Sequence, residues 1–177
     1  MAGVIALITF SSSAEQPPID TGPNLGSNIP SLTVLDQFGD KQQLANIRGK
    51  KGSIIVLFRS ADWCPFCKRH LLELNGEVDK FKQKGYGVTA ISYDSPAILR
   101  MFAQKNKLKF SLLSDQNVET FKALHVVNKD NEPGDRHYGI PYPGVIVVNN
   151  QGQIVHKYFY EGYKKRVKFK QLLSELM

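Results

Sequence analysis

The sequence predicts an α/β fold with a mixed central sheet that is covered by helices on both faces. Short β-branched and aromatic runs alternate with segments that carry apolar residues at helical spacing, which is typical of parallel crossover units. Residues 53–58 form a continuous apolar run, the pattern of a strand buried on both faces. Two strand-like runs near the end flank a glycine-containing turn and predict added antiparallel pairing.

Composition limits the class of protein. A chain of 177 residues fits one domain and is long enough to bury a core. No apolar segment approaches the ~18 to 20 residues of a membrane-spanning helix, so we expect no integral membrane span. Only two cysteines are present, and they stand in one short motif. Their role is therefore chemical or metal-binding rather than that of a disulfide framework.

The formal net charge of +7 includes one dense basic stretch near the C-terminus. Its residues are Lys164, Lys165, Arg166, Lys168 and Lys170, with Val167, Phe169, Leu172, Leu173 and Leu176 interspersed at helical spacing. This pattern predicts a terminal helix with a solvated basic face. No glycine-rich phosphate loop or nucleic-acid motif is present, so we expect no nucleic-acid partner. The oligomeric state is not determined by the sequence, and we expect a monomer.

The N-terminal segment resembles a secretory signal. An apolar run, Val4–Phe10, is followed by small residues up to Ala14, which predicts a signal peptide over residues 1–14 and cleavage before Glu15. Residues 15–30 then form a flexible lead-in, and the folded domain covers 31–177. We therefore expect an exported protein, periplasmic or otherwise extracytoplasmic. The basic n-region is missing, which leaves a cytoplasmic location as the alternative.

The elements are expected in a simple order along the chain. A short β-excursion over Leu32–Leu35 and Gln42–Leu44 comes first, then the strand 53–58 and a long helix that ends at Gly85. The apolar stripe of that helix is Cys67, Leu71, Leu74, Val78 and Phe81. The remaining elements are a strand at Val88–Tyr93, a helix from Pro96, a strand at Phe110–Leu113, a short helix at Val118–Leu124, a polar loop at Asn128–Tyr138, strands at Val145–Val148 and Ile154–Tyr160, and the basic helix.

The chemistry is concentrated where the first buried strand meets the long helix. Cys64 stands at the predicted helix N-terminus, where free backbone N–H groups and the helix dipole stabilise a thiolate. Pro65 suits the first helical turn. Cys67 is one turn further on, facing the core. We therefore assign Cys64 as the accessible attacking thiol and Cys67 as the resolving thiol, with exchange through a mixed disulfide.

At these residues the chain resembles the thioredoxin superfamily, and its redoxin or AhpC/TSA peroxiredoxin-like branch in particular. The resemblance covers roughly Ile29–Tyr163 and is carried by Arg59–Cys67, Ala90–Pro96, Leu112–Asp115 and Gly139–Gly144. It implies a thioredoxin-like fold with a cis-proline beside the active site. Pro143, which directly precedes a strand, is the first candidate and Pro141 the second.

The resemblance implies a thiol–disulfide oxidoreductase that needs no organic cofactor. Its partners would be protein dithiols or disulfides, or a small thiol or peroxide. We expect Pro143 to orient the substrate chain, and Trp63, Phe66 and Tyr142 to contact the substrate. The buried acid that thioredoxins carry six residues before the first cysteine is replaced by Phe58. Proton transfer then falls to water or to Asp62, which is equally interpretable as a solvated turn residue.

Two alternatives remain open. The first is a peroxiredoxin-like thiol peroxidase, in which one cysteine forms a sulfenic acid and the other resolves it. The family motif P-x-x-x-T-x-x-C is not intact: with Cys67 at the peroxidatic position, Cys64 falls on the threonine and Ser60 on the proline. The family's peroxide-polarising arginine would fall near Pro143, where none exists, although Arg59 is available nearby in sequence.

The second alternative is a metal site, for which copper is the candidate. Cys64, Cys67 and His70 supply three soft or borderline ligands. No second cysteine pair completes a zinc site, and His70 is equally typical of the polar face of a helix. We therefore predict no metal ligand.

Overall fold

The computed structural model describes residues 18–176, and the predicted signal segment 1–14 lies outside them. Within that range, no helix has both the length and the hydropathy needed to cross a bilayer. The elements are β1 (Val34–Asp36), β2 (Lys41–Gln42), α1 (Leu44–Ile47), β3 (Gly52–Leu57), α2 (Pro65–Gln83), β4 (Tyr86–Ser92), α3 (Pro96–Lys105), β5 (Ser111–Ser114), α4 (Glu119–Ala123), β6 (Gly144–Asn149), β7 (Ile154–Phe159) and α5 (Phe169–Glu175).

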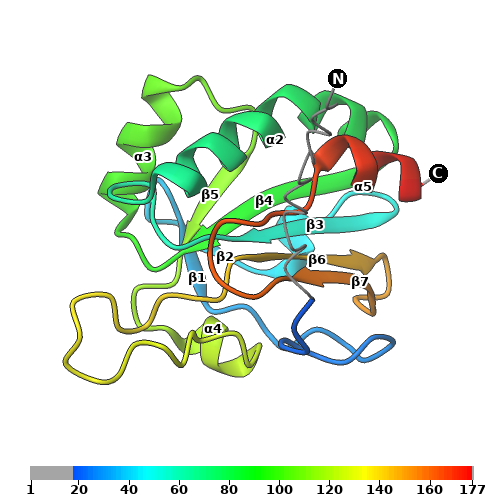
Figure 1. Ribbon diagram of the computed structural model, residues 1–177. Coiled ribbons are helices and arrows are strands. Elements are labelled where there is room, and N and C mark those ends of the chain that lie inside the picture. Colours follow the sequence, from blue (N-terminus) through cyan, green and yellow to red (C-terminus); the bar gives the residue numbers. More distant parts are fainter. Residues whose placement is uncertain (1–17, 177) are drawn as a thin grey trace, which may run out of the picture.

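The strands form one mixed sheet in the order β2-β1-β5-β4-β3-β6-β7 (Figure 1). Strands β3, β4 and β5 are parallel, and α2 and α3 are the crossover helices between them. Strands β6 and β7 add an antiparallel hairpin beside β3, and β1 and β2 pair antiparallel at the other edge. The mixed sheet and its antiparallel hairpin are therefore confirmed.

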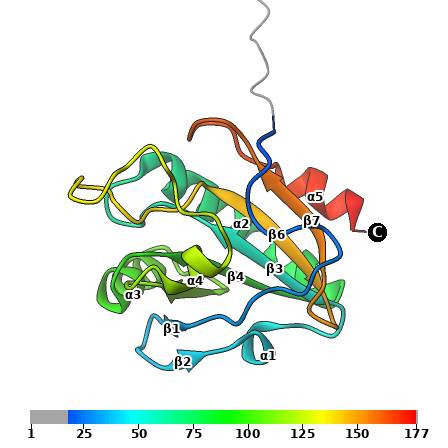
Figure 2. The same ribbon diagram turned by 90° about the horizontal axis from the view of Figure 1, so that it is seen from below.

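The alternation of side chains along β3 divides the core into two clusters. Ile54, Val56 and Phe58 pack with the apolar residues of α2, α3 and α5, whereas Ile55 and Leu57 pack with those of α4. Figure 1 shows α2, α3 and α5 above the sheet and α4 below it, and Figure 2 shows α1 on the β1–β2 side. Because both faces are covered, β3 is held rigidly up to its last residue, where the site begins.

The described part of the predicted lead-in, residues 18–30, is tied to the domain. It follows the outer edge of β7, with isolated bridges from Pro18 to Tyr160 and from Asn28 to Gln153. The backbone N–H of Ile19 donates to the carbonyl of Phe159 at 3.1 Å. This segment covers the exposed hydrogen-bonding groups of an edge strand, which are otherwise open to association.

Two predicted elements differ from the observed ones. The β-excursion ends at Gln42, and Leu44 begins the short helix α1 instead of continuing a strand. The basic helix is shorter than predicted and begins only at Phe169. Val167 and Phe169 are both buried. Burial of every second residue is the pattern of extended chain rather than of a helix. Most of the basic stretch therefore lies in the segment before α5 rather than on a helix face.

His70 is buried, so its assignment to the polar face of the helix was wrong. Its side chain on α2 is 6 % exposed, stacks on Phe169 with ring centroids 4.4 Å apart, and has Nε2 3.0 Å from the carbonyl oxygen of Val167. Burial, together with the charges of Arg166 and Lys168, lowers the pKa of His70 to about 4, although the bond to Val167 opposes this shift. His70 therefore joins α2 to α5 as a neutral ring.

This burial predicts a pH-dependent stability. Below pH 6.5 the unfolded chain protonates His70 and the folded chain does not, so stability falls as the pH drops from 6.5 toward about 4. The loss due to this one group should reach about 3 kcal/mol. Urea unfolding at several pH values tests this. His70→Phe should flatten that slope, whereas the control His156→Phe should keep it; an unchanged slope in His70→Phe contradicts the assignment.

Candidate active site

The two cysteines are placed by the junction of β3 and α2. Buried strand β3 ends at Leu57, and a short turn leads to Cys64, the N-cap residue of α2, with Pro65 in the first turn. Cys64 and Cys67 form a disulfide, with their Cα atoms 5.3 Å apart. The predicted pair is therefore present at the predicted helix end.

The helix N-terminus acts directly on Cys64. The backbone N–H of Cys67 donates to Cys64 Sγ at 3.2 Å, and the lysine one residue later donates its N–H to the Cys64 carbonyl. An N–H group aimed at sulfur and the positive end of a 19-residue helix both favour a thiolate over a thiol.

Both sulfurs are buried in the disulfide form. Cys64 and Cys67 are each 1 % exposed, which corrects the expectation that Cys64 is open to a partner. The physical reason is local packing: Trp63 and Phe66, which flank Cys64, both pack against the same core cluster as the two cysteines. A reaction partner therefore reaches the sulfurs only when these rings move.

A cation sandwiched between aromatic rings stands beside the disulfide. The Arg59 guanidinium lies 4.7 Å from the Trp63 ring centroid and 4.8 Å from that of Tyr163. His137 stacks on the Trp63 ring, with the two ring centroids 4.1 Å apart. Burial lowers the pKa of Arg59, and in the described part of the chain its buried Nε has no hydrogen-bond partner. The side chain is thus a partly desolvated positive charge rather than one extended into solvent.

Phe66, between the two cysteines, has its own neighbours. It meets Tyr163 edge to face at 5.5 Å between ring centroids, and the Arg69 guanidinium lies 4.7 Å from its centroid. Tyr163 thus contacts both Phe66 and Arg59. In Figure 1 the orange-red segment after β7 runs across toward the start of α2, consistent with these contacts.

Asp94 supports the turn that carries the cysteines. It is 5 % exposed, and its carboxylate accepts hydrogen bonds from the Ala61 N–H at 2.6 Å and from the hydroxyls of Ser60 and Ser92. The Ser60 hydroxyl in turn accepts from the N–H groups of Asp62 and Trp63. Burial raises the pKa of Asp94, while these donors oppose that shift. Ser60, at the family's proline position, therefore links Asp94 to the backbone just before Cys64.

Asp94 lies just before the predicted helix from Pro96, and its role in supporting the turn was not predicted from the sequence. The N-cap of α3 is Ser95, while Asp94 turns inward from the carboxyl end of β4. Its place directly after a buried strand was the available signal, since side chains there gather at one edge of a parallel sheet. Asp62, which the sequence left open as a proton carrier or a solvated turn residue, is exposed.

The other predicted residues are not all brought to the cysteines. Pro143 is buried and precedes Gly144, which pairs with Leu57 at the end of β3, so it lies at the correct edge. Residues 18–176 contain no cis peptide bond, so the expected cis-proline at Pro143 or Pro141 is wrong. Pro141 is instead bridged to Val127. Tyr142 packs against the core cluster on the opposite face from Cys64.

The metal alternative finds no support in the geometry. Among the described residues no group of three or more His, Cys, Asp or Glu side chains could hold an ion. The His70 ring nitrogen Nε2 is 3.0 Å from the Val167 carbonyl oxygen, while Cys64 and Cys67 are bonded to each other.

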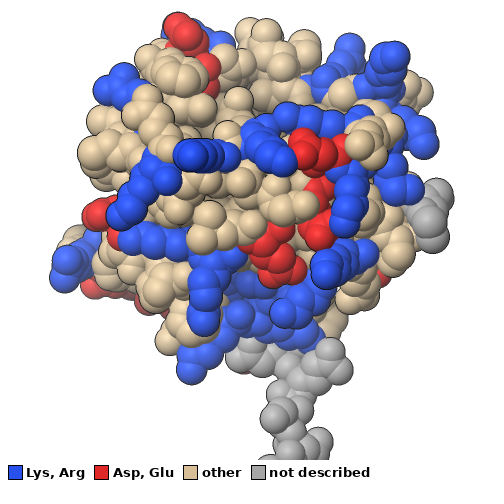
Figure 3. Space-filling view, turned by 90° about the horizontal axis from the view of Figure 1, so that it is seen from above, with Lys and Arg blue, Asp and Glu red and all other residues tan. Residues whose placement is uncertain are grey.

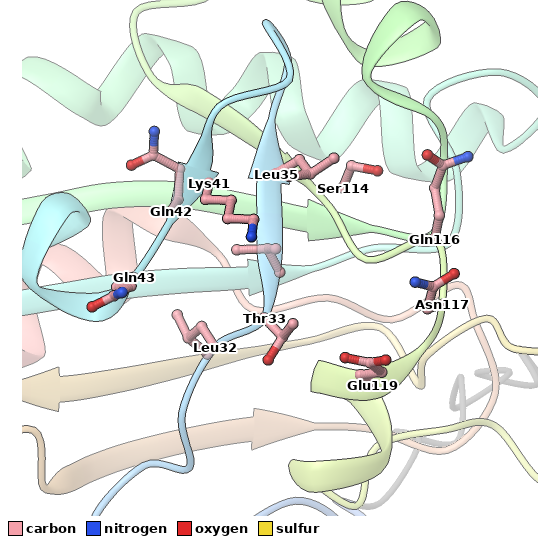
Figure 4. Close-up of a pocket in the computed structure, with 11 residues that line it drawn as sticks. Leu32, Thr33, Leu35, Lys41, Gln42, Gln43, Ser114, Gln116, Asn117 and Glu119 are labelled. Carbon is pink, nitrogen blue, oxygen red and sulfur yellow. The ribbon is translucent and has the colours of Figure 1, made fainter.

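A separate cavity of about 450 Å³ lies over β1 and β2 (Figure 4). Polar side chains such as Thr33, Asn117 and Glu119 border it. None of the residues that line it is a cysteine or a histidine. Nothing in this cavity therefore adds to the thiol chemistry.

Comparison with known proteins identifies the family. The sheet and the paired cysteines at the start of α2 define a thioredoxin-like fold. Residues 25–157 match the AhpC/TSA family, and the chain belongs to that family. It is 34 % identical to chloroplastic peroxiredoxin Q of Populus jackii over 147 residues, covering 81 % of this chain and 68 % of the relative. It is 36 % identical to chloroplastic peroxiredoxin Q of Sedum lineare over 132 residues, covering 72 % of this chain and 70 % of the relative.

Solved structures agree on the fold. The peroxidoxin BcpB of Mycobacterium tuberculosis superposes with a TM-score of 0.74 and 16 % identity, covering 86 % of this chain and 95 % of that one. At this identity the likeness concerns the fold alone.

Replacement of a carboxylate oxygen of Asp94 should reduce the stability of the protein. Asp94→Asn replaces one of the two acceptor oxygens by an NH2 group, so either the Ser60 hydroxyl or the Ala61 N–H loses its acceptor, and the protein should be destabilised by about 1 to 3 kcal/mol. Urea unfolding measures this loss. Asp62→Asn, at an exposed position of the same turn, is the matched control and should change stability by less than about 0.5 kcal/mol. Equal effects of the two substitutions would refute the supporting role of Asp94.

Proposed function

We propose that this protein is a thiol peroxidase, which reduces hydroperoxides with Cys64 and Cys67. The observation that carries the proposal is the Cys67 N–H donated to Cys64 Sγ at the start of α2, with the partner sulfur bonded to it. Membership of the AhpC/TSA family supports it, as do the printed names of the relatives, which are peroxiredoxins. Peroxide reduction needs a stabilised thiolate and a second thiol within reach. The N–H aimed at Cys64 Sγ and the position of Cys67 one helical turn away support both.

In the first step, the Cys64 thiolate attacks one oxygen of the hydroperoxide. An S–O bond forms, the O–O bond breaks, and the departing oxygen takes a proton from solvent and leaves as water or an alcohol. Cys64 becomes a sulfenic acid, so the sulfur is oxidised and the peroxide is reduced.

In the second step, Cys67 restores a closed pair. Its thiolate attacks the Cys64 sulfur, the disulfide forms, and the sulfenic oxygen leaves as water once protonated. The two residues are one helical turn apart, so no large movement is required. An external dithiol then reduces the disulfide by exchange and completes the cycle.

The burial of the disulfide favours peroxidase chemistry over general disulfide exchange. With both sulfurs 1 % exposed, the disulfide reacts with a folded protein only after the covering rings move, which disfavours exchange with arbitrary protein substrates. Thiol–disulfide exchange remains in the proposal as the reductive half of the cycle. Trp63, Phe66 and Pro143 keep their proposed part as the surroundings of the reacting sulfur.

Arg59 is our candidate for the positive charge that the family places near Pro143. Its guanidinium is held by Trp63, the residue before Cys64, and by Tyr163. A partly desolvated cation stabilises the negative charge that develops on the peroxide oxygen as the O–O bond breaks. The charge thus comes from the end of β3 instead of from the loop before β6.

Single-cysteine variants test which sulfur reacts. Reduced Cys67→Ser keeps the backbone N–H that faces Cys64, so it should consume one equivalent of hydrogen peroxide and form a sulfenic acid that dimedone traps on Cys64. Cys64→Ser should react no faster than free cysteine. Rapid-mixing fluorescence of Trp63, the single tryptophan, follows the reaction, and mass spectrometry locates the adduct.

Because Cys67 stands at the family's peroxidatic position, the reverse result is informative. A dimedone adduct on Cys67 in Cys64→Ser, with Cys67→Ser inert, would exchange the two roles within the same function. If neither variant nor the reduced protein outpaces free cysteine, the peroxidase proposal fails.

Removal of the Arg59 charge should slow the peroxide step. Arg59→Gln should lower its rate constant by about a hundredfold, measured by peroxide consumption, because one donor to the developing charge is lost. The matched control Arg100→Gln, at an exposed position of α3, should react like the unaltered protein. A normal rate in a folded Arg59→Gln protein rules out the proposed role of this arginine.

A further inference from the structure

A basic groove is lined in part by Phe66, which stands between Cys64 and Cys67 in sequence. It encloses about 470 Å³, and its lining comes from two segments: Phe66, Arg69, His70 and Glu73 of α2, and Lys164–Arg166 and Lys168 of the segment before α5. We propose that this groove docks an acidic segment of the dithiol protein that reduces the Cys64–Cys67 disulfide. The proposal rests on the peroxidase cycle above, because it assigns the reductant of that cycle.

The position of the groove links it to the reaction. Phe66 lines the groove and stands between Cys64 and Cys67 in sequence. Its ring contacts Tyr163, which immediately precedes the basic segment. A chain bound in the groove is therefore next to the redox pair, and it rests on the segment whose Tyr163 packs against both Phe66 and Arg59.

The groove carries a large excess of positive charge. Five of its lining side chains are Lys or Arg, and Glu73 is its single carboxylate. The Glu73 side chain is already used, since it accepts a hydrogen bond from the Phe169 N–H at 3.4 Å. On the face seen from above in Figure 3, Lys and Arg side chains are more widespread than Asp and Glu.

Four of these five side chains have no ion pair among the described residues, namely Arg69, Lys164, Arg166 and Lys168. Arg166 is the most buried of them, and its Nη2 has no hydrogen-bond partner in the described part of the chain. Burial and the nearby charge of Arg59 lower the pKa of Arg166 to about 10, so it stays protonated at neutral pH. A desolvated guanidinium with an unused N–H is satisfied by a carboxylate.

An acidic protein fits this groove better than other anions because the adjacent disulfide needs electrons. Only a thiol-bearing partner can resolve the bond by exchange, and neither a nucleic acid nor a lipid surface supplies thiols. Opposite charges across such a surface raise the association rate and select among partners. Carboxylates on the reductant would therefore place its thiol beside Cys64.

Charge-matched dithiol peptides test this proposal with the full protein. Three peptides of equal length share one Cys-Gly-Pro-Cys centre and differ only in flanking residues, which are Glu, Gln or Lys. The rate of disulfide reduction, followed by Trp63 fluorescence, should be about tenfold higher for the Glu peptide than for the Lys peptide. Added salt should reduce this preference, since the contacts are electrostatic.

Charge reversal locates the effect. Lys164→Glu/Lys168→Glu should abolish the preference for the Glu peptide and leave reduction by dithiothreitol unchanged. The control Lys50→Glu/Lys105→Glu makes the same change in net charge at exposed positions, before β3 and at the end of α3. It should retain most of the preference. Equal losses in both double variants would overturn the groove and indicate an effect of net charge alone.

Peroxide reduction is measured separately, so the two proposals fail independently. The reduced Lys164→Glu/Lys168→Glu protein should consume hydrogen peroxide at the same rate as the unaltered protein. If the unaltered protein itself consumes peroxide slowly, that result counts against the peroxidase function and not against the groove. Equal rates for the three peptides overturn the groove. Competitors give a further test, in which a cysteine-free Glu peptide, a single-stranded oligonucleotide and phosphatidylglycerol vesicles are each added to the reduction by the Glu dithiol peptide. The proposal is overturned if the oligonucleotide or the vesicles inhibit this reduction at a lower concentration than the cysteine-free Glu peptide does.

Discussion

The structure depends on the way a strand buried on both faces runs into the N-terminus of a long helix. β3 cannot shift, because Ile54 and Val56 belong to one core cluster and Ile55 and Leu57 to the other. Its rigid end fixes where α2 begins, and the first free N–H groups of α2 meet the sulfur of Cys64. The turn between β3 and α2 is held by hydrogen bonds that the Ser60 hydroxyl and the Ala61 N–H donate to the Asp94 carboxylate. The N–H group that faces the Cys64 sulfur is therefore positioned by packing that extends through the sheet.

The surroundings of the disulfide combine protection with charge. Trp63 and Phe66 shield the sulfurs, and Arg59 and Tyr163 brace those rings from the loop side. This arrangement suits a site that admits a small oxidant and keeps its oxidised state from indiscriminate exchange. The reductant that we propose engages the covering segment, where the basic residues after Tyr163 line a groove.

Much of the fold could be predicted from local patterns. The apolar run 53–58, the cysteine stripe of α2 and the Gly152 turn each carry their structure in neighbouring residues, and all three elements were confirmed. The failures concern contacts between distant segments. His70 is buried because Val167 and Phe169, about a hundred positions later, close over it. Likewise, Arg59 is held by Tyr163, and neither partner signals the other in sequence. The cis-proline came from the resemblance alone, and Pro141 and Pro143 are both trans.

The titration of Cys64 in reduced Cys67→Ser protein tests the central claim most directly. The substitution keeps the backbone N–H of position 67, so the thiolate stays stabilised, and the ultraviolet absorbance of the thiolate reports its formation. We predict a Cys64 pKa at least about one unit below the ~8.5 of an unperturbed cysteine thiol. A pKa at or above that ordinary value would contradict the account, because the start of α2 would then have no effect on the sulfur it faces.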